Sequence, residues 1–175
     1  MKSKSQLIFI SFIFAIFLIY FFSTKIPSPQ KTYEEEAKSL LKELSKENLN
    51  NNKVRKKSKE LTQKGIYLLK IFNKTLPKCD KYFAAIKKAA HIIPNLKLDQ
   101  IEKDYHADGA LPENTNANCY HVKDLVVHPA TVYAMAKNGL LKDLESFNSA
   151  KHEIEEVIAH FKIVKPLLKK KSSKQ

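Results

Sequence analysis

The residues best suited to chemistry in this 175-residue chain lie in the segment NCYHVKDLVVHPATV, residues 118–132. Cys119, His121, Asp124 and His128 fall within ten positions there. If the segment is helical, the two histidines and the aspartate are spaced i, i+3 and i+7 and share one face. Two imidazoles and a carboxylate are a suitable ligand set for zinc or non-haem iron.

The proline at position 129 favours another structure for the same segment. Proline disfavours helical backbone at the residue before it, here His128, and the valines at 126 and 127 also suit an extended approach. In this interpretation Pro129 opens a short helix, Asp124 bonds locally, and Cys119 ties the corner to an earlier helix. We expect this structural corner rather than a metal or catalytic site.

A second group of candidate residues is DYHADG, residues 104–109. It resembles the first half of a calcium-binding loop, but the twelfth position is Thr115 rather than the required glutamate. We therefore expect the end of a helix running into a turn. A disulfide from Cys119 would draw this loop inward, and a mixed site that includes His91 is conceivable. The candidate metal ligands are then His106, His121, Asp124 and His128, with Asp108 nearby.

The third group is HEIEEVIAH, residues 152–160, where His152, Glu156 and His160 are spaced i, i+4 and i+8. The apolar stripe of the same helix points elsewhere, so we expect a solvated flank. The chain lacks C-x-x-C, a glycine-rich phosphate loop, G-x-S-x-G and H-E-x-x-H. These absences indicate no enzyme class.

The two cysteines, Cys79 and Cys119, are predicted to form one disulfide. Two thiols in an exported domain favour a pair. The bond would close a loop of about 40 residues and stabilise the fold by roughly 3–4 kcal/mol. The alternative is two unrelated buried thiols in a cytosolic domain, against which the polar surroundings of Cys119 count.

Apolar residues recur at helical spacing through most of the chain. Helices are expected from 33 to the turn at 48–52, over 54–72, 79–93, 129–138 and 142–165, with one or two turns at 98–106. No period-two run indicates strands. We predict an all-α, near-antiparallel bundle of about five helices, preceded by a hydrophobic membrane helix. The divisions are a signal-anchor (1–25), a short stalk (26–32), the bundle (33–168) and a basic tail (169–175).

The N-terminal run LIFISFIFAIFLIYFF, residues 7–22, is apolar apart from one serine and one tyrosine hydroxyl. As a helix it would rise about 24 Å, slightly under the hydrocarbon core of a bilayer. No small-x-small cleavage motif follows it, which favours an uncleaved anchor over a signal peptide. We expect a single-pass membrane protein with its C-terminal domain outside the cytoplasm; the alternative is a secreted or periplasmic protein after cleavage.

Function is indicated only broadly by these features. The leading hypothesis is a non-catalytic accessory or scaffold subunit of the cell envelope, with a protein partner and no cofactor. The alternative is a bundle that binds a divalent metal or haem through the histidines and aspartates of residues 104–128. Arg55 is the only arginine, which argues against specific nucleic-acid recognition.

The net charge of +13 predicts attraction to anionic surfaces such as lipid or cell-wall polymers. The tail lysines that would make this contact are Lys169, Lys170, Lys171 and Lys174. Binding to an anionic polymer should weaken steeply with salt, because exposed charges are screened. Retention of the protein on such a polymer at rising salt concentration checks this, and salt-insensitive retention would contradict it.

Overall fold

The computed structural model describes residues 29–169. The predicted membrane segment at 7–22, the first part of the stalk and the tail lysines at 170, 171 and 174 lie outside the described residues. The α-helices are α2 (Pro29–Leu44), α3 (Asn51–Thr75), α4 (Asp80–Ile92), α5 (Leu98–Ile101), α6 (Ala117–Lys137) and α7 (Leu144–Lys169).

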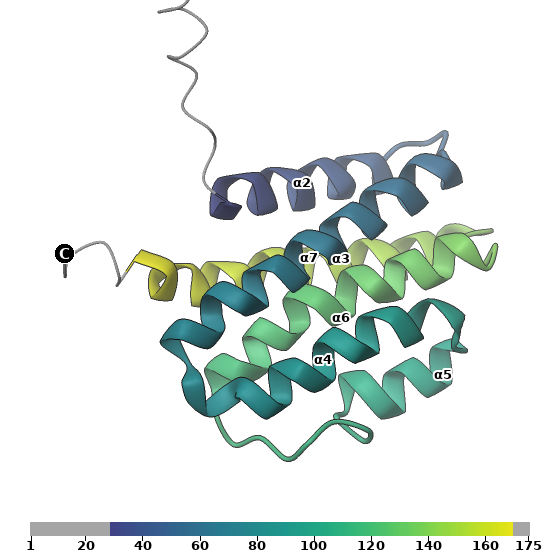
Figure 1. Cartoon of the computed structure of the whole chain (residues 1–175). Helices are drawn as coiled ribbons and strands as arrows, with labels where there is room; N and C mark the ends of the chain where they lie inside the picture. The colour runs from purple at the N-terminus through teal and green to yellow at the C-terminus, as the bar shows by residue number, and fades with distance from the viewer. Residues whose placement is uncertain (1–28, 170–175) are drawn as a thin grey trace, which may run out of the picture.

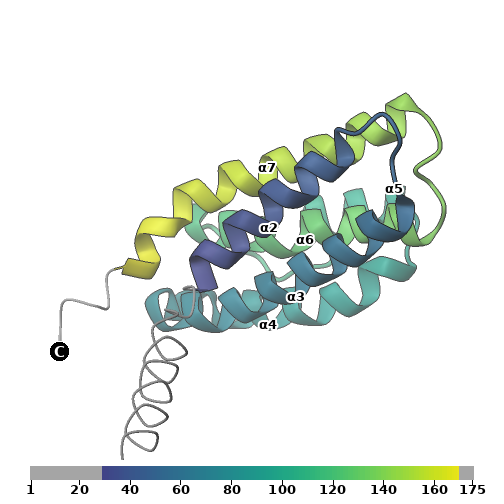
Figure 2. The same cartoon turned by 90° about the horizontal axis from the view of Figure 1, so that it is seen from above.

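The prediction of an all-α bundle is confirmed, with six α-helices and no strand between residues 29 and 169. Helix α6 is central: α3 and α7 pack along it, α4 lies beside it, and α2 rests on α3 and α7 (Figure 1). Helix α5 continues into one π-helical turn, Glu102–His106. Seen from above, α2 begins and α7 ends at the same end of the bundle (Figure 2). None of the helices within the described range is both long and apolar enough to cross a membrane.

Side chains just before three helices bind the free backbone N–H groups of the first turn. The Asn50 side chain accepts from the Lys53 N–H at the start of α3, and the Asn116 side chain accepts from the Asn118 N–H at the start of α6. Asp143 accepts from the Ser146 N–H at the start of α7. These caps satisfy donors that have no partner inside the helix, and so they determine where each helix begins.

The core is built from the apolar stripes that the sequence predicts. On α3 the buried stripe includes Val54, Leu61, Leu68 and Phe72, and on α7 it includes Ala150, Ile154, Val157, Phe161 and Val164. The sulfur atoms of Cys79 and Cys119 lie at disulfide distance, with their Cα atoms 5.8 Å apart. This pair joins the start of α4 to the first turn of α6.

The predicted corner at Pro129 is wrong, because α6 runs through the proline without a break. Proline has no N–H, so the carbonyl of Leu125, four residues earlier, loses its helical partner. The buried hydroxyl of Tyr33 on α2 donates to that carbonyl at 2.6 Å. Gly65 on α3 permits the close approach, since a Cβ there would strike the Leu125 carbonyl oxygen. The predicted helix 129–138 is therefore the second half of a longer helix.

The last helix also continues past its predicted end at residue 165. Helix α7 includes Pro166 and extends to residue 169. Leu167 and Leu168 pack partly buried against the core, so the final turn gains apolar contacts that offset the unfavourable proline.

Replacing Tyr33 by phenylalanine should lower the free energy of unfolding by about 1–3 kcal/mol, because the buried Leu125 carbonyl is left without a donor. Urea unfolding followed by circular dichroism measures the change. Tyr67→Phe is the matched control. Tyr67 is 52% exposed on α3, and loss of its hydroxyl should change the free energy of unfolding by less than about 0.5 kcal/mol. Equal stability of the two variants would contradict the role given to Tyr33.

Candidate metal centre

The continuous helix α6 places three potential ligands on one face. His121, Asp124 and His128 are spaced i, i+3 and i+7, and the helical condition for their alignment is met. The helix is buried along most of its length, so this face is directed into the protein. The Asp124 side chain is 1% exposed and that of His128 is 5% exposed.

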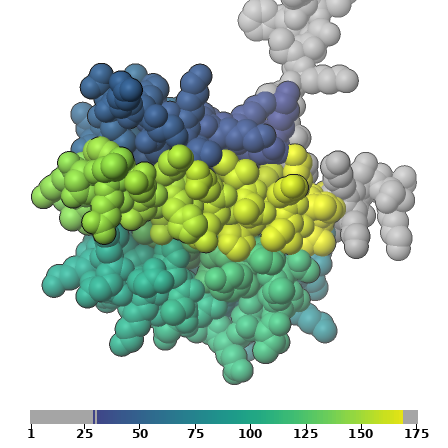
Figure 3. Space-filling view, turned by 180° about the vertical axis from the view of Figure 1, so that it is seen from behind, coloured from purple at the N-terminus to yellow at the C-terminus, as the bar shows by residue number. Residues whose placement is uncertain are grey.

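Helix α7 presents a second set with the same spacing, namely Glu153, Glu156 and His160. Helices α6 and α7 are connected by a short loop and pack along each other. In these contacts the residue numbers rise along α6 as they fall along α7, as antiparallel packing requires. His121 meets His160 near the start of α6, and His128 meets Glu153 one helical stretch later. Figure 3 shows α7 crossing the back of the molecule between α2–α3 and the α4–α6 side.

The π-helical turn after α5 supplies His106. Its Nε2 atom lies 3.0 Å from the Thr131 hydroxyl of α6. Its ring stands edge-on to the ring of His128, with centroids 4.8 Å apart. π-Helical turns often occur at functional sites, because the extra residue re-aims a side chain. Three separate segments therefore converge beside the middle of α6.

The first of two ligand groups is the Asp124 triad, defined as His121, Asp124 and His160. The Nδ1 atoms of the two histidines are 2.7 Å apart. The Nε2 atom of His160 lies 3.4 Å from Oδ2 of Asp124. One atom from each residue comes within 4.8 Å of the others, which is close enough to converge on one ion.

The second group is the Glu153 triad, defined as His106, His128 and Glu153. Oε2 of Glu153 lies 2.7 Å from Nδ1 of His128 and 3.7 Å from Nε2 of His106. The other nitrogen of His128, Nε2, faces Oδ1 of Asp124 at 3.6 Å. His128 thus stands between the two triads.

Asp124 is the least satisfied polar group in this region. Among the residues from 29 to 169, neither of its carboxylate oxygens has a hydrogen-bond partner. The nearest nitrogen atoms belong to His160, Lys123 and His128, at 3.4, 3.5 and 3.6 Å. Buried carboxylates are ordinarily hydrogen-bonded or coordinate a metal, so a pair of unpartnered oxygens calls for an explanation.

Burial sets the protonation of the triads. It lowers the pKa of His128 to about 4 and that of His160 to about 4, where the neighbouring His128 adds to the effect. It raises the pKa of Asp124 to about 7, partly offset by Lys123, and that of Glu153 to about 7. At neutral pH the two histidines are therefore neutral and keep the lone pair that a metal ion needs.

Lys123 is a fully buried cation that organises the edge of the site. Its ammonium donates to Oδ1 of Asp108 at 2.8 Å and to the His106 carbonyl at 2.9 Å. The Tyr82 hydroxyl donates to the other oxygen of Asp108 at 2.8 Å. Asp108 has a left-handed backbone, φ 60°, which aspartate tolerates better than most residues. This pairing holds the loop after the π-helical turn, and with it His106, against α6.

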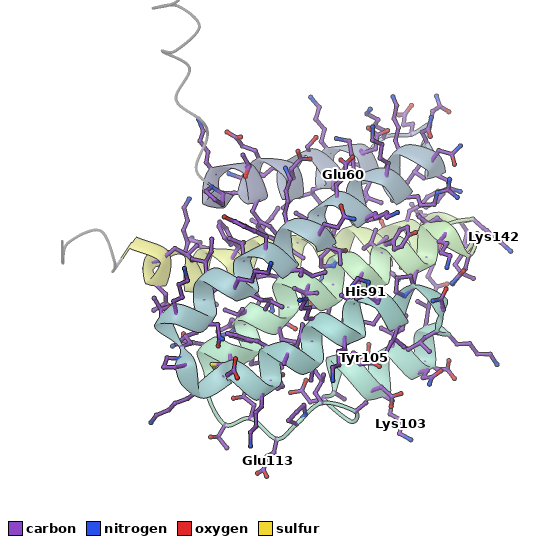
Figure 4. The ribbon with its side chains drawn as sticks, in the orientation of Figure 1. Glu60, His91, Lys103, Tyr105, Glu113 and Lys142 are labelled. Carbon is purple, nitrogen blue, oxygen red and sulfur yellow. A yellow bond between two sulfur atoms is a disulfide. The ribbon has the colours of Figure 1, made fainter. Side chains whose placement is uncertain are left out.

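The four predicted ligands, His106, His121, Asp124 and His128, all lie at this centre, two in each triad. Asp108 does not approach His121 and instead pairs with Lys123. His91 is exposed on α4, labelled in Figure 4, and belongs to neither triad. The calcium-loop resemblance has no counterpart, because the Asp104 side chain is in neither group.

The prediction of a solvated flank for residues 152–160 holds for His152, which is 70% exposed, but is wrong for Glu153 and His160. Their side chains are 19% and 17% exposed and complete the two triads. The missed signal was the spacing of residues 153, 156 and 160, which repeats that of 121, 124 and 128.

No protein-family profile matches the chain, and neither a curated protein nor a solved structure is significantly similar to it.

Replacing Lys123 by methionine should lower the free energy of unfolding by about 3 kcal/mol, because it breaks a buried ion pair with Asp108. This value is at the low end of the range for such pairs, since the Asp108 side chain is 30% exposed and water can partly solvate it. Urea unfolding measures the loss. Lys162→Met, at an exposed position of α7, is the control and should change stability by less than about 0.5 kcal/mol. Adding Asp108→Asn to the Lys123 variant should restore part of the loss. A double variant no more stable than Lys123→Met would show that the two residues are not coupled.

Proposed function

We propose that the protein is a metal-binding helical bundle that holds a divalent transition-metal ion at the Asp124 triad. The observation that carries this proposal is the buried Asp124 carboxylate, which has no hydrogen-bond partner among the described residues and faces imidazole nitrogens. The Lys123 ammonium lies 3.5 Å away but directs its hydrogen bonds to Asp108 and the His106 carbonyl, so a bound cation would supply the contact that the Asp124 oxygens lack. Neutral imidazoles and a carboxylate suit zinc, iron, copper or nickel.

The spacing of the ligand atoms supports an ion of this size. With bonds of about 2.0–2.2 Å, two ligands on a tetrahedral ion stand about 3.3–3.5 Å apart. The Nε2 atom of His160 lies 3.4 Å from Oδ2 of Asp124, which matches this value, whereas the contact of 2.7 Å with His121 is made by the other nitrogen of the His160 ring, Nδ1. One ligand atom from each of the three residues lies within 4.8 Å of the others, so rotation of an imidazole ring would bring all three onto one ion. A haem is not favoured, since histidine nitrogens 2.7 Å apart leave no slot for a porphyrin between them.

We also propose that the bundle is tethered outside the cytoplasm by the apolar segment 7–22. The sequence of that segment and the disulfide-distance pair of Cys79 and Cys119 support this location. Helix α2 begins and α7 ends at the same end of the bundle (Figure 2). The segment that we propose as the anchor and the basic tail are therefore both connected to that end. Contact of these lysines with anionic headgroups fits that arrangement. An accessory role with a protein partner stays a prediction.

The test is metal content per chain of the full-length protein, purified in detergent under oxidising conditions and equilibrated with Zn²⁺ or Co²⁺. Elemental analysis should find bound metal, and Asp124→Asn should lower it by one ion per chain, since the amide is a weaker ligand of nearly the same shape. Without metal, Asp124→Asn should be at least as stable as the wild type, because an unpartnered buried carboxylate is removed.

His91→Ala/His152→Ala is the matched control, because it also removes imidazoles but takes both from outside the triads. Its metal content should equal that of the wild type. A saturating ion should also raise the unfolding free energy, by about 2.7 kcal/mol at a hundredfold excess over Kd. A metal-free wild type, or an Asp124→Asn variant with unchanged metal content, would overturn the proposal.

A further inference from the structure

We propose that the Glu153 triad holds a second ion of the same class, so that the protein contains a two-metal centre with His128 between the ions. This inference rests on the proposed function for the first ion, but it concerns different ligands. The second set is supplied by the π-helical turn, α6 and α7, which contribute His106, His128 and Glu153.

The Glu153 triad has the geometry of a ligand set. The distances from Glu153 Oε2 to His128 Nδ1 and to His106 Nε2 are 2.7 and 3.7 Å, on either side of the tetrahedral value of about 3.4 Å. The three side chains are largely buried, with exposed fractions of 12% for His106, 5% for His128 and 19% for Glu153. They come from three separate segments, so their convergence is a property of the tertiary fold.

Between residues 29 and 169, no lysine or arginine forms an ion pair with Glu153. Lys123 is the buried ammonium of the region, and its hydrogen bonds go to Asp108 and to the His106 carbonyl. The described partners of the Glu153 carboxylate are His128 and His106. A divalent ion bound by all three residues would supply the positive charge that this carboxylate lacks.

His128 connects the second ion to the first. Its Nδ1 atom faces Glu153 at 2.7 Å, and its Nε2 atom faces Asp124 at 3.6 Å. With one nitrogen directed to each triad, the ring can bridge two ions by losing its N–H proton to solvent. Two metal–nitrogen bonds of about 2 Å and the width of the ring would place the ions on the order of 6 Å apart. Ions bridged in this way interact magnetically.

The Glu153 triad supplies three protein ligands and leaves a coordination position open, as catalytic metal sites do, whereas Nε2 of the bridging His128 would give the first ion a fourth protein ligand. Glu156 lies beside the His128 ring: its Oε2 atom is 3.4 Å from His128 Nε2, and its side chain is 41% exposed. Glu156 therefore marks the side on which the centre approaches the surface. The arrangement therefore fits a centre with exchangeable ligands, accessible from the surface along α7.

The test is a Cu²⁺ titration of the full-length protein in detergent, with stoichiometry from calorimetry and spin coupling from electron paramagnetic resonance. The wild type should bind two ions with a broadened or diminished Cu²⁺ signal. His106→Ala/Glu153→Gln and His121→Ala/His160→Ala should each bind one ion and show an isolated Cu²⁺ spectrum. The single, nearly isosteric Glu153→Gln variant should also lose one ion, and it removes the least packing.

His91→Ala/His152→Ala is again the control and should keep both ions and their coupling. One ion in the wild type, lost in Asp124→Asn, would overturn the two-metal inference and leave the proposed function standing. No ion in the wild type would overturn both. Two ions with an uncoupled spectrum would overturn the bridging role of His128. Thermal unfolding of each variant without metal identifies any that fail to fold, and for these Glu153→Gln decides.

Discussion

The hydrogen bond from the Tyr33 hydroxyl to the Leu125 carbonyl is the interaction on which the rest of the structure depends. Pro129 removes the N–H that Leu125 would otherwise receive, and an unpaired carbonyl in the centre of a bundle is strongly unfavourable. The phenol supplies the missing donor from α2, and Gly65 lets α3 approach the same point. Helix α6 therefore stays continuous, and only a continuous α6 places His121 and Asp124 on the same face as His128.

A second constraint is the antiparallel packing of α6 and α7. Each helix carries three potential ligands at the same spacing, so a single choice of register brings both sets together. The apolar stripe of α7, with Ile154 and Val157 fully buried, sets that register through core packing. Glu153 and His160, on the neighbouring flank of α7, then face α6. The histidines and carboxylates are held at the edge of a hydrophobic interface, and this environment determines their ionisation.

The electrostatics of the region are unusual for the interior of a small bundle. Lys123 and Asp108 form a pair that Tyr82 completes, so this part of the network is satisfied. Asp124 has the Lys123 ammonium at 3.5 Å but no hydrogen bond, Glu153 faces two imidazoles, and burial raises the pKa of each carboxyl to about 7. Such groups reduce stability unless something charged binds between them. That imbalance is the physical reason for favouring a metal centre over a purely structural corner.

The sequence by itself determined the all-α class, the apolar stripes of α3 and α7, the pairing of Cys79 with Cys119 and four of the candidate ligands. Those features depend on local periodicity and residue type, which can be read within one segment. It did not determine whether α6 would continue through Pro129. The hydroxyl that compensates for the missing N–H belongs to Tyr33, which is 92 residues before Leu125 in the sequence. Nor did it show that Glu153 and His160 face inward, because α7 is polar on more than one face and only its packing against α6 decides which polar face is covered.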